Sequence, residues 1–159
     1  MSLSNDHLYR LLAEHQAAYV RCIDHDALES WPDFFDEVCH YRITTADNHR
    51  RGLEAGLIYA DSKGMLRDRI SALREANIYE QQSYRHVLSP PLIRTRESNG
   101  ISSETSFLVA RIMRTGETEL FVTGRYFDRY RIDGERLLIR ERIVACDSAR
   151  IDTLLALPL

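Results

Sequence analysis

A chain of 159 residues, with 44% hydrophobic and 28% charged side chains, is long enough to bury a proper core, and we expect a single domain spanning residues 1–159. The net charge of −3 gives no reason to expect a nucleic acid or an anionic membrane as partner. No apolar run approaches the roughly 20 residues that cross a bilayer, and the N-terminus lacks a signal core. Three cysteines at wide spacing predict free thiols in a cytoplasmic protein.

The first part of the chain carries helical patterns. Residues 4–25 repeat apolar side chains every three or four positions, with Ser4 as N-cap, which predicts an amphipathic helix. Asp26 and Glu29 have the spacing of a capping box, so a second short helix is expected to start at Asp26. Pro32 favours a further helical start close behind it.

The stretch VCHYRITTADNH contains four residues of metal-ligating types. Residues 37–45 alternate apolar and polar side chains, which predicts a strand, so the adjacent Cys39 and His40 point to opposite faces and cannot easily share one ion. Asp47 and His49 follow in a pattern typical of a turn, where Asp and Asn bond their own backbone. We interpret the stretch as a strand and a turn rather than a metal site.

The remainder of the chain is mostly strand. Residues 53–61 are ambiguous, with a short strand at LIYA, and residues 62–77 are helical. The strand patterns that follow cover 82–96 (interrupted by Pro90 and Pro91), 103–114, 118–132 and 136–147. Turns at Thr115-Gly116-Glu117 and Asp133-Gly134 separate the last three. Helices followed by long antiparallel strands predict an α+β fold, with the helices on one face of a curved sheet.

Two strand segments carry candidate catalytic side chains. Tyr84 and His86 share a face, and His86 could act as a general base in a pocket. A histidine satisfied by a neighbour in or beside the sheet is the more frequent arrangement. Asp128 lies among aromatic residues on one face of its strand, as a catalytic carboxylate or as an ion-pair partner.

Arginines gather on the opposite face of that strand and of the next one. The arginines expected on this face are Arg125, Arg129, Arg131, Arg140 and Arg142. Pairing with Glu119 or Glu141, or contact with another subunit, explains such a face better than nucleic-acid binding. The chain contains no G-x-S-x-G, P-loop, G-x-G-x-x-G or H-E-x-x-H motif. The residues alone therefore predict an oligomeric α+β domain without a recognisable active site.

Several segments together resemble a known family. The most specific are Trp31-x-x-Phe34-Phe35, Arg67-x-Arg69-Ile70, Tyr84-Arg85-His86 and the final strand ERIVACDS. Over nearly its whole length the chain resembles the small (beta) subunit of bacterial aromatic-ring-hydroxylating dioxygenases. The stretches DNHRRGLEAG and DTLLALPL are most similar to the terephthalate dioxygenase branch of that family.

The resemblance implies a nuclear-transport-factor-2-like (cystatin-like) cone and a non-catalytic structural role. It implies no catalytic, cofactor-binding or metal-binding residue in this chain. The partner would be a large (alpha) subunit that holds a Rieske [2Fe-2S] cluster and a mononuclear iron and receives electrons from NADH through a reductase. Three small subunits would form a trimer within a three-plus-three hexamer. The complex would insert dioxygen into an aromatic compound, such as the aromatic carboxylate terephthalate, in aromatic catabolism.

The alternative is an independent dehydratase, isomerase or hydrolase on the same cone. Tyr41, His86 and Asp128 would then serve as acid and base in an apolar cavity. A small-molecule binding module is a third alternative that no feature favours. The apolar ending Ile151–Leu159 and the arginine face suit a subunit interface, so deleting Ser148–Leu159 is expected to weaken assembly.

Overall fold

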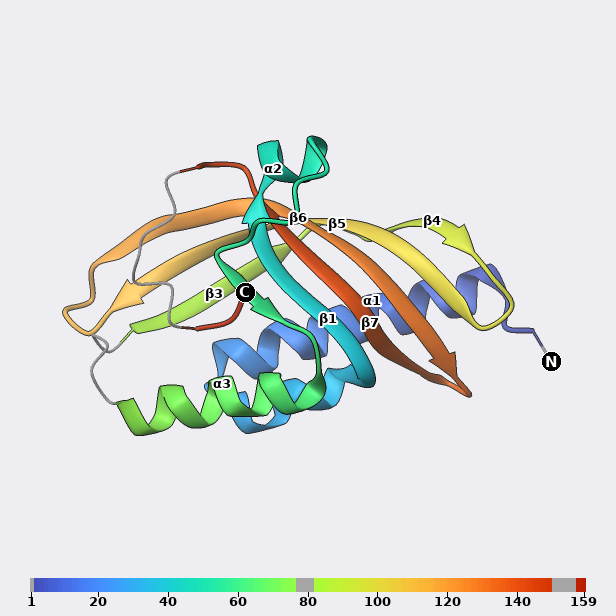
Figure 1. Cartoon of the computed structure of the whole chain (residues 1–159), viewed down its shortest axis with the longest axis horizontal. Helices are drawn as coiled ribbons and strands as arrows, with labels where there is room; N and C mark the ends of the chain where they lie inside the picture. The colour runs from blue at the N-terminus through green and yellow to red at the C-terminus, as the bar shows by residue number, and fades with distance from the viewer. Residues whose placement is uncertain (1, 77–81, 150–156) are drawn as a thin grey trace.

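The computed structural model describes residues 2–76, 82–149 and 157–159 (Figure 1). Its elements in chain order are α1 (Asn5–Asp24), the 3-10 helix η1 (Leu28–Phe34), β1 (Phe35–Thr45), α2 (Ala46–Arg50), β2 (Ile58–Ala60), α3 (Lys63–Ala76), β3 (Gln82–Leu88), β4 (Leu92–Arg96), β5 (Gly100–Met113), β6 (Thr118–Asp133) and β7 (Arg136–Cys146). Among the described residues, no helix is long and apolar enough to cross a membrane.

Helix α1 begins as predicted, because the Ser4 hydroxyl accepts a hydrogen bond from the backbone N–H of His7. The prediction of a second helix starting at Asp26 is wrong. Asp26 has a left-handed backbone, with φ of 58°, and η1 begins two residues later. Its carboxylate binds Arg74 of α3 instead of capping a helix, and Pro32 lies inside η1 rather than at a helix start.

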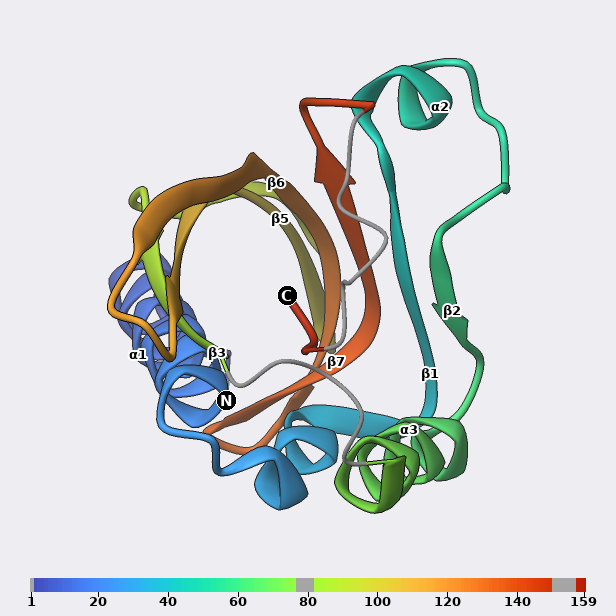
Figure 2. The same ribbon diagram turned by 90° about the vertical axis from the view of Figure 1, so that its left-hand side faces the viewer.

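The strands form one sheet in the order β2-β1-β7-β6-β5-β3, and β4 also pairs with β5. All neighbours run antiparallel except β1 and β7, which are parallel, an arrangement that the strand pattern did not predict. Figure 2 shows the sheet curling around an interior, with α1, η1 and α3 along its open side. This is the α+β fold that the residue patterns predict, with the cone shape that the family resemblance implies.

Turn residues end the strands where the sequence places them. Pro90 and Pro91 separate β3 from β4, and both strands then pair with β5. Gly116 and Gly134 take positive φ angles of 89° and 62° in the two hairpins that link β5, β6 and β7. The turn predicted after β1 is a short helix, α2, because the Thr45 hydroxyl caps it by accepting from the N–H of Asn48.

Aromatic side chains fill the base of the cone, where η1 meets α1 and β1. Trp31, Phe35 and Tyr41 are fully buried and meet edge to face, with Trp31 and Tyr41 ring centres 5.1 Å apart. Tyr19 of α1 joins this cluster through Phe35. Edge-to-face contacts favour such clusters beyond the area that they bury. The cluster therefore fixes α1 against the first strand.

Candidate functional site

The three candidate catalytic residues all point into the cone. Tyr41 on β1, His86 on β3 and Asp128 on β6 keep 0%, 6% and 2% of their surfaces exposed. None of the hydrogen bonds made by these three described side chains joins one of them to another. Each is held by a different partner, so the fold does not assemble them into one acid–base site.

Tyr41 is engaged with the end of the described chain. Its hydroxyl donates to the backbone carbonyl of Leu159 at 3.0 Å and accepts from the Leu159 N–H at 3.1 Å. Burial raises the pKa of this phenol well above its usual value, so it stays protonated. Tyr41 therefore already donates its hydroxyl proton to Leu159 and has none free for a substrate.

His86 is tied to the end of α1. Its Nδ1 lies 2.6 Å from Oδ1 of Asp24, and its backbone N–H donates to the other carboxylate oxygen at 2.9 Å. The His86 side chain is completely enclosed, and its Nε2 has no hydrogen-bond partner. A carboxylate that orients a histidine is also found beside catalytic bases. The His86 side chain is enclosed by the described residues, however, so a substrate could not reach it. The interpretation of His86 as a histidine held by a neighbour beside the sheet is the better one.

Asp128 forms an ion pair at the centre of the cone. Arg142 of β7 donates to both carboxylate oxygens at 2.8 Å, and Tyr130 donates to one of them at 3.0 Å. The Arg142 guanidinium also lies between two aromatic rings, 4.1 Å from the centre of Tyr19 and 4.2 Å from that of Tyr126. The sequence allowed two roles for Asp128, a catalytic carboxylate or an ion-pair partner. The contacts with Arg142 favour the ion-pair partner.

The predicted arginine face is correct for β6 and wrong for Arg142. Arg125 and Arg129 are exposed on the outer face, and Arg129 lies opposite Glu141 of β7. A register shift between Arg129 and Tyr130 turns Arg142 inward, where it is completely buried. The sequence interpretation missed Arg142 as the partner of Asp128. Finding it requires locating this bulge, and the pattern of apolar and polar residues in β7 does not mark the bulge.

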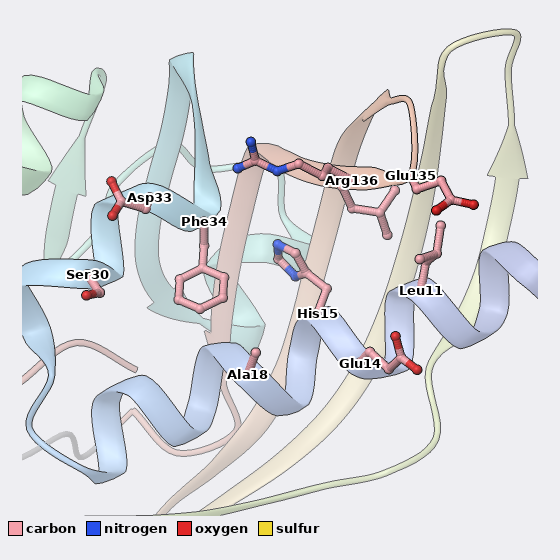
Figure 3. Close-up of a pocket in the computed structure, with 10 residues that line it drawn as sticks. Leu11, Glu14, His15, Ala18, Ser30, Asp33, Phe34, Glu135 and Arg136 are labelled. Carbon is pink, nitrogen blue, oxygen red and sulfur yellow. The ribbon is translucent and has the colours of Figure 1, made fainter.

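An open groove of about 460 Å³ lies beside α1 (Figure 3). Its lining residues come from α1, η1 and the β6–β7 turn with the start of β7, and they are Leu11, Glu14, His15, Ala18, Ser30, Asp33, Phe34, Glu135, Arg136 and Leu137. The sequence interpretation missed this groove, because no motif marks side chains that three separate elements bring together.

His15 lies at the centre of the groove lining and meets Phe34 and Tyr130 edge to face, at centroid distances of 5.4 and 5.2 Å. Burial, with the nearby Arg142 charge, lowers the pKa of His15 to about 3, so its ring is neutral at neutral pH. A group with so low a pKa is a poor proton acceptor at that pH. The groove is therefore a surface depression of mixed polar and apolar lining rather than an acid–base centre.

The cysteines do not form a metal site. Cys22, Cys39 and Cys146 are free, and burial raises the pKa values of their thiols to about 11, 11 and 12. Thiolate is the form that binds metal, so such thiols are poor ligands. Within residues 2–76, 82–149 and 157–159, no three His, Cys, Asp or Glu side chains gather in a way that could hold an ion. These residues therefore do not fit an iron–sulfur cluster or a mononuclear iron.

The stretch VCHYRITTADNH does not bring its metal-ligating residue types together. Cys39 is buried inside the cone, whereas His40 lies on the outer side with its Nδ1 3.0 Å from Asp61. His49 of α2 packs on the ring of Phe127 at 4.1 Å. The stretch VCHYRITTADNH is thus a strand followed by a short helix.

Comparison with known proteins identifies the family. The model of the ring hydroxylating beta subunit family matches residues 18–153. The chain is 53% identical, over 93% of its length and 96% of the relative, to a beta subunit of the terminal oxygenase component of terephthalate 1,2-dioxygenase from Comamonas. It is 35% identical to the anthranilate 1,2-dioxygenase small subunit of Burkholderia cepacia, over 91% of this chain and 89% of that one.

A solved structure agrees with these relatives. The beta subunit assigned to an aromatic-ring-hydroxylating dioxygenase of Novosphingobium aromaticivorans superposes with a TM-score of 0.88 at 37% identity, covering 96% of this chain and 97% of that one. The prediction of a dioxygenase small subunit is confirmed, and the alternative of an independent enzyme is not favoured. The chain belongs to the ring-hydroxylating dioxygenase beta subunit family.

Proposed function

We propose that this chain is the structural small subunit of an oxygenase that acts on an aromatic carboxylate such as terephthalate, in aromatic catabolism. The observation that carries the proposal is 53% identity, across almost the whole chain, to a subunit of terephthalate 1,2-dioxygenase. The more distant anthranilate 1,2-dioxygenase is also named for an aromatic carboxylate. Both relatives therefore support the same substrate class.

The buried side chains support a structural rather than a catalytic role for this chain. The three candidate catalytic residues are held by Leu159, Asp24 and Arg142, and each contact is enclosed in the core. A catalytic group must reach a substrate, and moving any of these side chains would first break a buried hydrogen bond. The chain on its own is expected to be inactive.

The proposed partner is a large subunit that holds a Rieske [2Fe-2S] cluster and a mononuclear iron and receives electrons from NADH through a reductase. Three large and three small subunits would form the complex in the cytoplasm. The outer face of the sheet supports an assembly, because Val87, Leu108 and Leu120 are large apolar side chains that are 54%, 38% and 66% exposed. Val87 and Leu108 are directly opposite each other on β3 and β5. Exposed apolar clusters of this kind are typical of interfaces.

The test is co-expression with a large subunit, followed by light scattering, iron analysis and oxygen consumption with NADH, reductase and terephthalate. The expected result is a three-plus-three mass, iron only in preparations that contain the large subunit, and activity only in the complex. Anthranilate in place of terephthalate distinguishes the two aromatic carboxylates. Turnover of an aromatic carboxylate by the small subunit alone, or failure of the two chains to associate, would contradict the proposal.

A further inference from the structure

Arg42 on β1 is a buried cation that has no counter-charge among the described residues. It keeps only 9% of its surface exposed, and the alternation of the strand puts it on the outer face, opposite to Tyr41. Its guanidinium makes no hydrogen bond or ion pair within the described part of the chain, and its Nε is buried without a partner. Arg142, the other buried arginine there, is paired with Asp128. An unpaired buried charge is costly, so Arg42 indicates a counter-charge from outside the chain.

The segment between α2 and β2 holds the stem of Arg42 in place. The Gly56 backbone packs so closely on this stem that an added Cβ atom would lie 2.8 Å from the Arg42 Cγ. The segment is itself fixed to β1, because the Thr44 hydroxyl donates to the backbone carbonyl of Ala55 at 2.9 Å. The stem is therefore ordered before any partner binds, which lowers the entropy that binding would cost.

Arg42 belongs to a row of side chains that crosses the outer face of the sheet. It lies opposite Ile143 of β7, which lies opposite Phe127 of β6, so Arg42 and Phe127 are two strand spacings, about 10 Å, apart. His49 of α2 packs on the Phe127 ring, and the Arg42 charge lowers the pKa of His49. Glu141 also acts on His49, but it forms no ion pair with Arg42. The row thus leaves Arg42 unpaired beside an aromatic surface.

More positive charge borders this row. A hollow of about 160 Å³ lies beside His49, and its lining includes Arg50 and Arg125. Arg125 is exposed and makes no ion pair within the part of the chain that the structure describes. Asp147 also lines the hollow, and its carboxylate accepts a hydrogen bond from the Thr123 hydroxyl at 2.8 Å. Positive side chains therefore outnumber negative ones around the hollow.

The α2 surface, by which we mean Arg42, His49, Arg50, Arg125 and Phe127, is not covered by another described helix. Figure 2 shows α2 at the opposite end of β1 from α3. A surface that combines an ordered arginine, aromatic rings and an excess of positive charge matches the composition of interface anchors. Its charge is complementary to that of an acidic partner.

We propose that the α2 surface docks an acidic segment of the partner large subunit, and that an aspartate or glutamate carboxylate of that segment pairs with the Arg42 guanidinium. The planar guanidinium can donate two parallel hydrogen bonds to a carboxylate. Arg50 and Arg125 attract the remaining acidic side chains of the segment. This inference rests on the proposed function, which supplies the partner.

The test measures association with the large subunit by light scattering of the mixed subunits over a dilution series. Arg42→Met keeps an apolar stem and removes the charge, so it should weaken association about 30-fold, as when one member of an enclosed charge pair is removed. Arg114→Met is the matched control, because Arg114 is exposed in the turn between β5 and β6. It should change association less than about twofold.

Thermal unfolding of the isolated chain separates docking from folding. Arg42→Met should leave Tm unchanged or raise it, because no ion pair is lost and an apolar side chain replaces a poorly hydrated charge. A fall in Tm of more than about 5 °C would overturn the inference, since Arg42 would then stabilise the fold itself.

Arg42→Lys keeps the experiment decisive if the methionine variant does not fold. Lysine retains the charge but not the planar fork, so association should weaken about fivefold. Association of both variants as tight as that of the unmodified chain would overturn this inference and leave the proposed function standing. Failure of the unmodified chain to bind the large subunit would instead contradict the proposed function, and this inference with it.

Discussion

Arg142 and Asp128 form an ion pair with two parallel contacts of 2.8 Å, and both side chains are completely enclosed. Arg142→Met is expected to lower the free energy of unfolding by about 3–5 kcal/mol, because it leaves Asp128 charged and unpaired in the core. Adding Asp128→Leu should recover part of that loss. Urea unfolding of the two variants measures both effects.

Arg140→Met is the matched control on the same strand. Arg140 is 53% exposed and lies 3.5 Å from Asp36, so its loss should cost less than about 1 kcal/mol. If Arg142→Met were no more destabilising than Arg140→Met, the buried pair would not contribute to the stability of the cone.

Gly124 occupies a place on β6 where no larger residue fits. A Cβ atom there would collide with the backbone carbonyl of Ala145 and the ring of Phe107. Gly124→Ala should therefore cost about 1–3 kcal/mol through overpacking. Gly64→Ala on α3 is the control, because its added methyl meets only an ordinary contact and alanine favours helix. Thermal unfolding should show opposite signs for the two substitutions, and a neutral Gly124→Ala would contradict the close packing.

His15 makes stability depend on pH. Its pKa is about 3 in the fold against an ordinary value of 6.5, so the unfolded chain binds the extra proton between these values. The stabilisation is complete above pH 6.5 and decreases as pH falls toward 3, by up to about 1.4 kcal/mol per pH unit. His15→Gln should flatten this part of the profile relative to the unmodified chain. Parallel unfolding curves from pH 4 to 7 test this difference.

Arg74 connects α3 to the segment between α1 and η1. It donates to Glu29 at 2.7 Å and to both the carboxylate and the backbone carbonyl of Asp26. Arg74→Met should cost about 1 kcal/mol, since the group is partly solvated. Arg67→Met, at an exposed position of the same helix, should be close to neutral. Equal unfolding midpoints for the two variants would show that this connection does not stabilise the chain.

The sequence predicts those features of the fold that depend on nearby residues. The Ser4 cap, the break at Pro90 and Pro91 and the turn at Asp133-Gly134 all follow from local backbone chemistry, and the structure confirms each. Asp26 shows where such reasoning fails. Its spacing to Glu29 suits a capping box, yet Arg74, far along the chain, binds both carboxylates instead.

The inward position of Arg142 could not be predicted for a similar reason. Strict alternation back from the Asp133-Gly134 turn places Arg142 with the outer arginines, but the bulge beside Tyr130 shifts the register by one residue and turns it inward. The apolar ending suggested docking, and we expected an interface between subunits. Leu157–Leu159 packs within its own chain, so its deletion should reduce folding stability directly. Residues 150–156 lie outside the described residues, so the interface expected for Ile151–Leu159 stays a prediction.

The parallel pairing of β1 with β7 also determines the order in which the chain can fold. Thr45 pairs with Cys146, and β7 lies between β1 and β6 in the sheet. During synthesis, β1 leaves the ribosome early, whereas its parallel partner β7 is the last of the described strands to leave. Pairing of strands so distant in sequence slows folding and prolongs the exposure of unpaired strand edges. A nascent chain can therefore form its helices and the β5–β6 hairpin, but it cannot join the two halves of its sheet until β7 has been made.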